Sequence, residues 1–248
     1  MFTKKGAEEM KALIKRTAAV PLAALLLLLF TGWVNAQDEV ADEITNQTIL
    51  IDKAIVTLND FTAEPNLDWF RKHIKDSYGI IIMPQLIKGG FIFGGSGGRA
   101  VLIARDDLTG EWSEPVFLIN LGVSWGLQIG GKASEVIVLI RTLRGLEEFY
   151  TSSVNLGAEA SIAAGPVGAT GEAATVPTLD ADYYSFAKSK GAFAGLSLSG
   201  STMRVNDAWN SEYYGRDVRP IEIIVRRKVS NPKSQDLIKA VKRVEKVY

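Results

Sequence analysis

The sequence has 248 residues, with 28 basic and 28 acidic side chains, and 47% of its residues are hydrophobic. These proportions are those of a globular protein and exclude a chain that is disordered throughout. A net charge of zero offers little of the basic field on which nucleic-acid binding depends, so no nucleic-acid partner is expected.

The chain contains no cysteine and a single histidine, His73. The absence of cysteine excludes disulfides, thiolate catalysis, cysteine-ligated metals and a lipidated N-terminal cysteine. One histidine excludes a two-histidine metal site within one chain. No metal and no other cofactor is expected, and much of enzyme chemistry is excluded with them.

Residues 1–36 have the pattern of a secretory signal peptide. An apolar run, residues 22–30, follows a basic segment and precedes the small-residue sequence Val34-Asn35-Ala36. The run is about ten residues long, whereas a membrane-spanning helix needs about 20. We therefore predict cleavage near Ala36 and a periplasmic or secreted mature protein. An uncleaved membrane anchor is the alternative.

The mature chain, residues 37–248, has a predicted net charge of −3, and the start of translation is either Met1 or Met10. It shows no boundary sharp enough to divide it into domains. A cysteine-free exported protein fits a bacterial periplasm, where disulfides are permitted but not required.

Two helices are predicted at the start of the mature chain. Residues 37–61 place apolar side chains at helical spacing, with acidic residues in the first turns, where the helix dipole favours negative charge. A short second helix, capped by Asn66, is predicted to turn Leu67, Phe70 and Ile74 toward the core.

From residue 78 the pattern changes to apolar strands separated by glycine, proline and polar turns. Pro84 is expected to end the first strand, residues 106–110 to form a hairpin turn, and Gly130-Gly131 to form another turn. The predicted strands cover residues 79–84, 91–93, 100–104, 116–130, 134–142, 155–167, 191–203 and 221–225.

Three further helices are predicted, over residues 143–152, over residues 206–214, and after Asn231-Pro232 at the C-terminus. The inward face of the last helix is predicted to carry Leu237, Val241, Val244 and Val247. Glycine within strands marks bulges and strong coiling. The whole predicts an α+β domain with N-terminal helices, a glycine-rich, strongly curved antiparallel sheet or small barrel, and a C-terminal helix.

The sequence around Ser96 matches G-x-S-x-G, the nucleophile elbow of hydrolases. That chemistry needs a strand-to-helix turn and a nearby histidine. Ser96 is followed by a predicted strand, and His73 lies in a charged segment. The pattern therefore favours a hairpin or bulge over a catalytic serine, and no catalytic residue is expected.

The same glycines could form a backbone nest for an anion, flanked by Lys88 and Arg99, although the pattern favours a tightly coiled sheet. Aromatic residues such as Phe91 and Trp112 are more often core. An exposed subset beside a basic residue would instead suit an acyl chain. The basic, amphipathic C-terminal helix either packs on its own domain or lies on anionic lipid.

Over about residues 40–216 the chain resembles the SYLF domain family, and the resemblance rests on a series of motifs in the family's order. The matching motifs are residues 78–84, 88–91, 94–99, 110–115, 126–131, 156–157, 164–168 and 190–201, Asn210 and residues 213–215. Glycines and the sequence Trp112-Ser113-Glu114-Pro115 dominate the pattern.

The resemblance implies a non-enzymatic module that binds lipid. Eukaryotic members are described as binding phosphoinositide membranes, and fungal members as binding actin filaments, through a basic amphipathic N-terminal segment. Here that stretch is a signal peptide followed by an acidic segment, Asp38 to Glu43. We therefore expect phospholipid or another envelope lipid rather than actin or phosphoinositides.

Two functional hypotheses follow. The first is an exported lipid- or membrane-binding module, with Lys88 and Arg99 holding a headgroup and Phe91 and Trp112 as apolar contacts. The second is a structural or interaction protein of the cell envelope that uses the glycine-rich sheet for partner or self-association.

Overall fold

The computed structural model describes residues 45–247 apart from residues 92, 126–129, 151–152, 169–180 and 197, and it does not describe the side chains of residues 90–93 and 123–131. Residues 45–248 form one compact unit. The predicted signal peptide, its cleavage site and the first part of the predicted helix, residues 37–44, lie outside the described residues.

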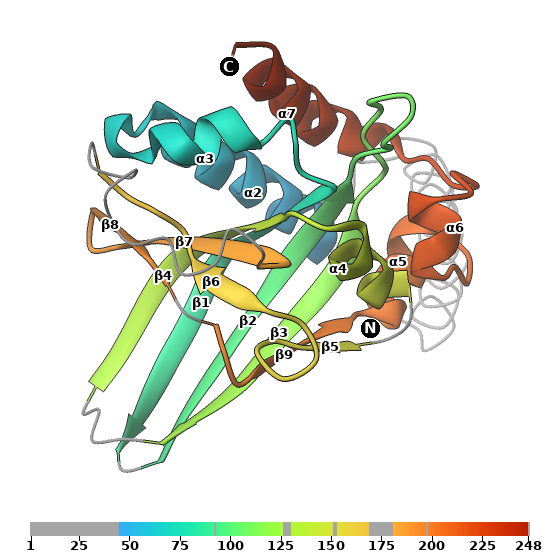
Figure 1. Ribbon diagram of the computed structural model, residues 1–248. Helices are drawn as coiled ribbons and strands as arrows, with labels where there is room; N and C mark the ends of the chain where they lie inside the picture. The colour runs from blue at the N-terminus through green and yellow to red at the C-terminus, as the bar shows by residue number, and fades with distance from the viewer. Residues whose placement is uncertain are drawn as a thin grey trace, which may run out of the picture. The chain divides into compact units, whose positions relative to one another are not determined.

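Helices occupy both ends of the described chain, and strands occupy its middle (Figure 1). The elements are α2 (Asn46–Ala63), η2 (Pro65–Leu67), α3 (Asp68–His73), β1 (Gly79–Phe91), β2 (Phe93–Ala104), β3 (Val116–Trp125), β4 (Gly130–Ile140), α4 (Leu143–Glu147), η3 (Glu148–Tyr150), β5 (Ser153–Asn155), β6 (Ile162–Ala164), β7 (Tyr183–Ser189), β8 (Ala192–Gly195), β9 (Ser201–Val205), α5 (Asp207–Tyr214), α6 (Pro220–Ile224), η4 (Pro232–Ser234) and α7 (Gln235–Val247). The fold class is α+β, as the sequence predicts.

The nine strands form one strongly curved, half-barrel sheet in the order β5-β9-β3-β2-β1-β4-β7-β6, and β8 pairs with β7. All pairs are antiparallel except β6 and β7, which run parallel, so the sheet is mixed rather than wholly antiparallel. Four long strands, β1 to β4, form its centre and extend beyond the helices at one end (Figure 1).

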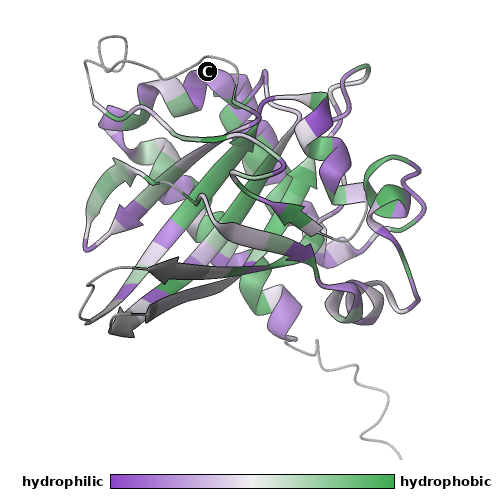
Figure 2. Cartoon of the chain, turned by 60° about the horizontal axis from the view of Figure 1, so that its bottom comes forward, coloured by the Kyte–Doolittle hydropathy of each residue, from purple (hydrophilic) through white to green (hydrophobic). Residues whose placement is uncertain are grey.

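One face of the sheet, here called the helix face, packs against α2, α3 and α7. Alternate strand residues such as Ile80, Val101 and Ile137 point to this side and form a core with the apolar stripes of these helices. Leu67, Phe70 and Ile74 are fully buried there, as predicted. Figure 2 shows the hydrophobic stretch of the strands beneath the helices, with more polar residues toward the end of the sheet that extends beyond the helices.

The second face, here called the opposite face, carries the neighbouring strand residues. Ile81, Leu102 and Val138 point to this side and pack with β5, β9, α4, η3 and α6. Both faces of the central strands are therefore buried in the half of the sheet that lies beneath the helices. The predicted inward residues Leu146 and Phe149 belong to this second core.

A β-bulge at Pro84 shifts the register of β1 against both neighbouring strands, between Ile82 and Gln85 on one side and between Met83 and Leu86 on the other. Proline lacks the N–H that a regular ladder position needs, and a bulge is one of the few sites in a sheet where it fits. The prediction that Pro84 ends the strand is wrong. The extra residue moves every later side chain of β1 to the other face relative to a regular strand.

Several other strand predictions are wrong, most of them because a glycine lies in a strand where a turn is predicted, or in a turn where a strand is predicted. Gly130 and Gly131 begin β4 and pair with β1 instead of forming a turn. Turns with positive φ at Gly157 and at Gly200 interrupt the two predicted long strands, 155–167 and 191–203. The buried strand β7 has no simple alternation, because both faces of its first half are covered, and the sequence patterns missed it.

The ends of the chain show further differences. Pro220–Ile224 form α6 where a strand over residues 221–225 is predicted, since Pro220 occupies the first helical position and Glu222 closes the first turn by accepting a hydrogen bond from the Arg219 N–H. Helices α5 and α7 are confirmed: Asn206 caps α5, and Asn231 caps η4, which leads directly into α7. Val247, however, is 66% exposed. Glu64 rather than Asn66 supplies the cap, at the start of η2, and α3 has no side-chain cap.

Candidate functional site

A groove runs along the helix face between α2 and the parts of the strands that the helices leave uncovered. It has two lobes, of about 430 and 440 Å³, which share Lys53, Pro84 and Gln85. The bulge at Pro84 places both Pro84 and Gln85 at the groove, so an irregularity of β1 forms its centre. We call this feature the helix-face groove.

The first lobe lies between α2, strands β1 to β3 and α5, and its lining combines apolar and basic side chains. Ile49, Ile87 and Trp209 supply apolar surface, and Lys53 and Arg99 supply positive charge. Its lining includes no carboxylate, and no described carboxylate forms an ion pair with either basic side chain. This combination suits a ligand with an anionic group and an apolar part.

Arg99 lies over the indole ring of Trp209, with its guanidinium carbon 4.4 Å from the ring centroid. Two contacts fix the position of Trp209. The Asn206 side chain caps α5 by accepting a hydrogen bond from the main-chain N–H of Trp209, and the Trp209 ring packs edge-on against Phe117. The buried Asn210 amide oxygen accepts from the Phe117 N–H at 2.9 Å and anchors α5 to β3. A cation stacked on an aromatic ring keeps its charge available to an anion.

The floor of the sheet beside this lobe is an exposed apolar row. Ile87, Gly97 and Leu121 are directly paired across β1, β2 and β3, and Ile87 and Leu121 are 53% and 51% exposed. Gly97 leaves open space between them, since an added β-carbon would have its nearest neighbour at 3.9 Å. Two exposed branched side chains flanking a glycine form a shallow apolar surface next to Arg99.

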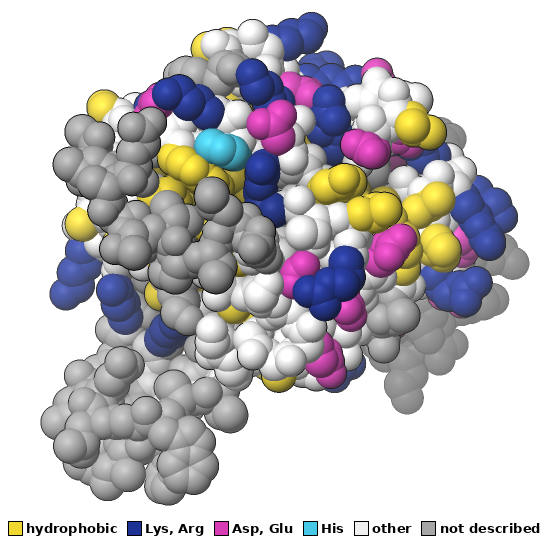
Figure 3. Space-filling view, viewed as in Figure 1, with side chains coloured by type: hydrophobic (Ala, Val, Ile, Leu, Met, Phe, Trp, Pro, Cys, Tyr) yellow, Lys and Arg dark blue, Asp and Glu magenta, His cyan; other side chains and the backbone are white. Residues whose placement is uncertain are grey.

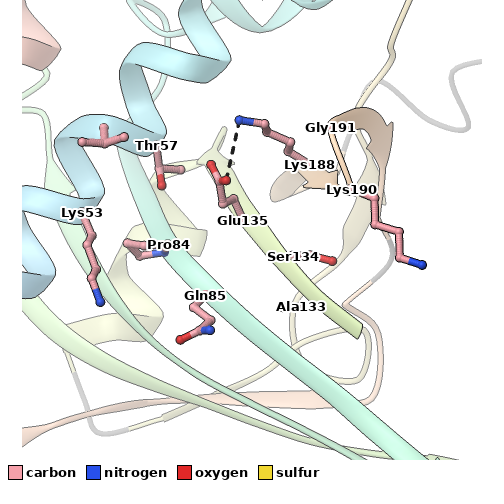
Figure 4. Close-up of a pocket in the computed structure, with 11 residues that line it drawn as sticks. Lys53, Thr57, Pro84, Gln85, Ala133, Ser134, Glu135, Lys188, Lys190 and Gly191 are labelled. Carbon is pink, nitrogen blue, oxygen red and sulfur yellow. Dashed lines mark ion pairs between the residues drawn. The ribbon is translucent and has the colours of Figure 1, made fainter. Parts of the chain in front are cut away.

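The second lobe lies between α2, β4 and the β7–β8 hairpin and is partly neutralised. Lys188 forms an ion pair with Asp60 and another with Glu135, and Figure 4 shows Lys188 pointing at Glu135 while Lys190 points away. The hydrogen bond from Lys188 to Asp60 raises the lysine pKa. Lys190 and Gly191 both have positive φ and form the two-residue turn of the hairpin.

The structure separates the two basic residues that the sequence grouped together. Arg99 faces the helix side with Val101, whereas Lys88 follows Leu86 on the opposite face. Without the bulge, Lys88 would share the face of Ile80 and Ile82. The register shift at Pro84 therefore prevents Lys88 and Arg99 from holding one headgroup.

The two predicted apolar contacts have different outcomes. The side chain of Phe91 lies outside the described residues. Trp112 is 3% exposed, and its indole N–H donates to Glu245 at 3.0 Å, so it belongs to the core between the 105–112 hairpin and α7. A buried ring held in this way presents no surface to a ligand. Lys53, Trp209 and Leu121, which the sequence patterns did not select, line or adjoin the groove instead.

Neither the serine motif nor the histidine has the setting of a catalytic group. Ser96 lies inside β2, paired with Lys88 and Gly122, rather than on a strand-to-helix turn. His73 stacks on Trp69 at 3.9 Å, and its Nδ1 lies 2.7 Å from the Trp69 carbonyl oxygen. Within the described residues no group of three or more His, Asp or Glu could hold a metal ion.

The surface shown in Figure 3 has basic and acidic side chains interspersed rather than gathered into one patch. This pattern agrees with the net charge of zero. In the part of the chain that is described, no helix has the length and apolar character needed to span a bilayer. Fold and site together define an α+β domain with an open groove on one face of its sheet.

The chain belongs to the Ysc84 family, whose model, described as "Las17-binding protein actin regulator", matches residues 121–244, half of the sequence. This is the family of the SYLF domain that the sequence motifs resemble. The match includes α5 and its anchor Asn210.

Relatives of known name are longer proteins. SH3 domain-containing YSC84-like protein 1 of Homo sapiens is 30% identical over 152 residues, which cover 61% of this chain and 44% of the relative. LAS seventeen-binding protein 3 of Saccharomyces cerevisiae is 31% identical over 145 residues, 57% of this chain and 31% of the relative. An SH3 domain-containing protein of Schizosaccharomyces pombe is 33% identical over 148 residues, which cover 58% of this chain and 34% of the relative. The chain thus spans less than half the length of these relatives.

Proposed function

We propose that this protein is a non-enzymatic module of the bacterial cell envelope that binds anionic lipid in the helix-face groove. The observation that carries the proposal is the first lobe, where Lys53 and Arg99 have no carboxylate partner among the described residues and stand beside exposed apolar side chains. The signal-peptide pattern of residues 1–36 supports export, and the family resemblance supports lipid as the ligand class.

The physical argument starts from the two kinds of surface in this lobe. Anionic headgroups are attracted by basic side chains near a lipid surface, at roughly 1 kcal/mol for each Lys or Arg. The apolar row of Ile87 and Leu121 is exposed to water, and covering it with hydrocarbon releases about 25 cal/mol for each Å². An anionic lipid meets both surfaces at once, whereas a free anion or a neutral lipid meets only one.

The test is flotation of the full-length protein with phosphatidylcholine vesicles that either contain or lack phosphatidylglycerol. Binding to the anionic vesicles is expected, and Lys53→Ala/Arg99→Ala should weaken it roughly ten- to thirtyfold. A matched control is Lys239→Ala/Arg243→Ala, which removes the same charge from the exposed side of α7 and should leave binding within about threefold of wild type.

Equal binding by the groove variant and the α7 control would overturn the groove assignment. If the wild type binds neither vesicle type, the lipid proposal fails and an envelope protein partner becomes the better account. The export half of the proposal has its own test. Cell fractionation with N-terminal sequencing should recover a periplasmic or secreted chain that begins near Gln37.

A further inference from the structure

Two lysines stand directly opposite each other on the face of the sheet away from the helix-face groove. Lys88 of β1 is paired with Lys132 of β4, and the preceding pair on that face is Leu86 with Ser134. Directly opposed residues of an antiparallel pair have β-carbons about 4.5–5.5 Å apart. The two ammonium groups therefore occupy the same small region of this face.

No carboxylate compensates this pair. Among the side chains that the structure describes, none forms an ion pair or hydrogen bond with Lys88 or Lys132. Lys88 is half-buried, and its burial together with the charge of Lys132 lowers its pKa. Like charges directly opposed across strands destabilise a sheet unless something offsets them.

The neighbouring residues on the same face are small and polar. Ser96 pairs with Lys88 on the other side of β1, and Gly122 follows on β3. The Ser96 hydroxyl occupies the space above Gly122, 2.5 Å from where a β-carbon would stand. One position nearer the core on β3, the fully buried Asn120 carries an amide whose oxygen and nitrogen both lack a described partner.

We propose that Lys88, Lys132 and Ser96 form a site for a phosphate-type dianion, held between the two ammonium groups with the serine hydroxyl as a further donor. A dianion offsets the repulsion between the lysines, which a monovalent counter-ion offsets only in part. A phosphomonoester headgroup of a lipid and free inorganic phosphate present the same chemistry. The site lies on the other face of the sheet from the helix-face groove, so it goes beyond the proposed function and does not depend on it.

The first experiment is thermal unfolding of the full-length protein in inorganic phosphate and in chloride at equal ionic strength. Phosphate at saturation should raise the Tm of the wild type by roughly 3–6 °C more than it raises that of Lys88→Met/Lys132→Met. The comparison between variants is essential because phosphate also stabilises proteins generally, by exclusion from their surface. The control Lys239→Met/Arg243→Met, which removes two exposed charges from α7, should keep the full shift.

Two further measurements separate a binding site from a merely structural pair. In chloride, Lys132→Met should unfold at or above the wild-type Tm, because the variant loses a repulsion. If the double variant does not fold, Lys132→Met alone provides the same test, since the Lys132 side chain is exposed. The quantity compared is then the rise in Tm that phosphate causes in this single variant and in the wild type. An equal phosphate shift in the wild type and in the lysine variants would overturn the proposal.

Vesicles distinguish the two sources of the anion. A preference for phosphatidylcholine vesicles that contain phosphatidic acid over vesicles of equal charge that contain phosphatidylglycerol, lost in Lys88→Met/Lys132→Met but kept in Lys53→Ala/Arg99→Ala, would identify a lipid phosphomonoester. A phosphate shift in solution without this vesicle dependence would identify a soluble phosphate. Both outcomes support the site. Because one double variant changes only this site and the other changes only the helix-face groove, the two proposals can fail independently of each other.

Discussion

Gly98 lies directly against the main-chain carbonyl of Gln85, and a β-carbon added to the glycine would stand 2.5 Å from that oxygen. The same β-carbon would meet the Met83 sulfur at 2.8 Å. Because Met83 and Gln85 flank Pro84, the bulge of β1 and the glycine of β2 are one structural unit. The bulge therefore requires glycine at position 98, and it also sets the face of Lys88, which follows it on β1.

We therefore expect Gly98→Ala to reduce the free energy of unfolding by about 1–3 kcal/mol, since the clashing atom belongs to the backbone and has little room to move. The neighbouring Gly97→Ala is the matched control. Its β-carbon would have 3.9 Å to the nearest atom, so the change should be less than about 1 kcal/mol. Urea denaturation of both variants measures the difference. Equal stabilities would show that the bulge is not held by Gly98.

The sequence predicts the fold class and most helices because their signals are local. Apolar spacing and capping residues identify the helices, and Asn231-Pro232 begins the C-terminal helical segment as expected, with Asn231 as the cap of η4. The register of a sheet is not local in this sense. In the sequence alone, a proline such as Pro84 predicts the end of a strand. The bulge that accommodates Pro84 depends on Gly98, a residue of the partner strand.

The site was less predictable for the same reason. Lys88 and Arg99 flank a glycine-rich segment in sequence, but a one-residue shift of register in β1 moves Lys88 to the face opposite that of Arg99. Lys132 stands opposite Lys88 only through the pairing of β1 with β4. No pattern within either strand contains that information, whereas the burial of Trp112 follows its ordinary tendency as an aromatic residue.

Glu245 of α7 holds the 105–112 hairpin by accepting from Arg105 at 2.8 Å and from the Trp112 indole at 3.0 Å. Glu245→Ala leaves the buried Trp112 N–H without its acceptor and should lower the free energy of unfolding by about 1–3 kcal/mol. Glu245→Gln keeps one acceptor oxygen and should lose less. Lys239→Ala, at an exposed pair on the same helix, should change stability by less than about 0.5 kcal/mol. A Glu245→Ala protein as stable as this control would contradict the assignment.

Asp182 should make stability depend on acid pH. Burial alone would raise the pKa of its carboxyl, but hydrogen bonds from Thr142 and Ser161 and the charge of Arg144 outweigh that effect and hold the pKa below 3.8. A carboxyl with a depressed folded-state pKa stabilises the protein above the unfolded-state pKa, and this contribution is lost as pH falls through the folded-state value.

We expect Asp182→Asn to cost about 2–4 kcal/mol at pH 7, because Ser161, Thr142 and Arg144 lose a charged acceptor. The difference between wild type and variant should shrink as the pH falls below 3.8. Urea denaturation at a series of pH values measures both quantities. A difference that stays constant across the acid range would show that the Asp182 charge contributes nothing.

Trp209 should report occupation of the first lobe. Its ring lies under the Arg99 guanidinium in the lining of the groove, so a lipid bound there draws Arg99 toward its headgroup and replaces water at the indole. We expect the tryptophan emission to move to shorter wavelength when anionic vesicles are added, and this shift should disappear in Trp209→Phe. Vesicle binding by Trp209→Phe should stay within about threefold of wild type, since phenylalanine keeps an apolar ring at this position. Trp69→Phe is the control, because Trp69 stacks on His73 outside the groove and its loss should leave the shift unchanged. A shift that persists in Trp209→Phe and vanishes in Trp69→Phe would move the lipid site away from the first lobe and toward α3.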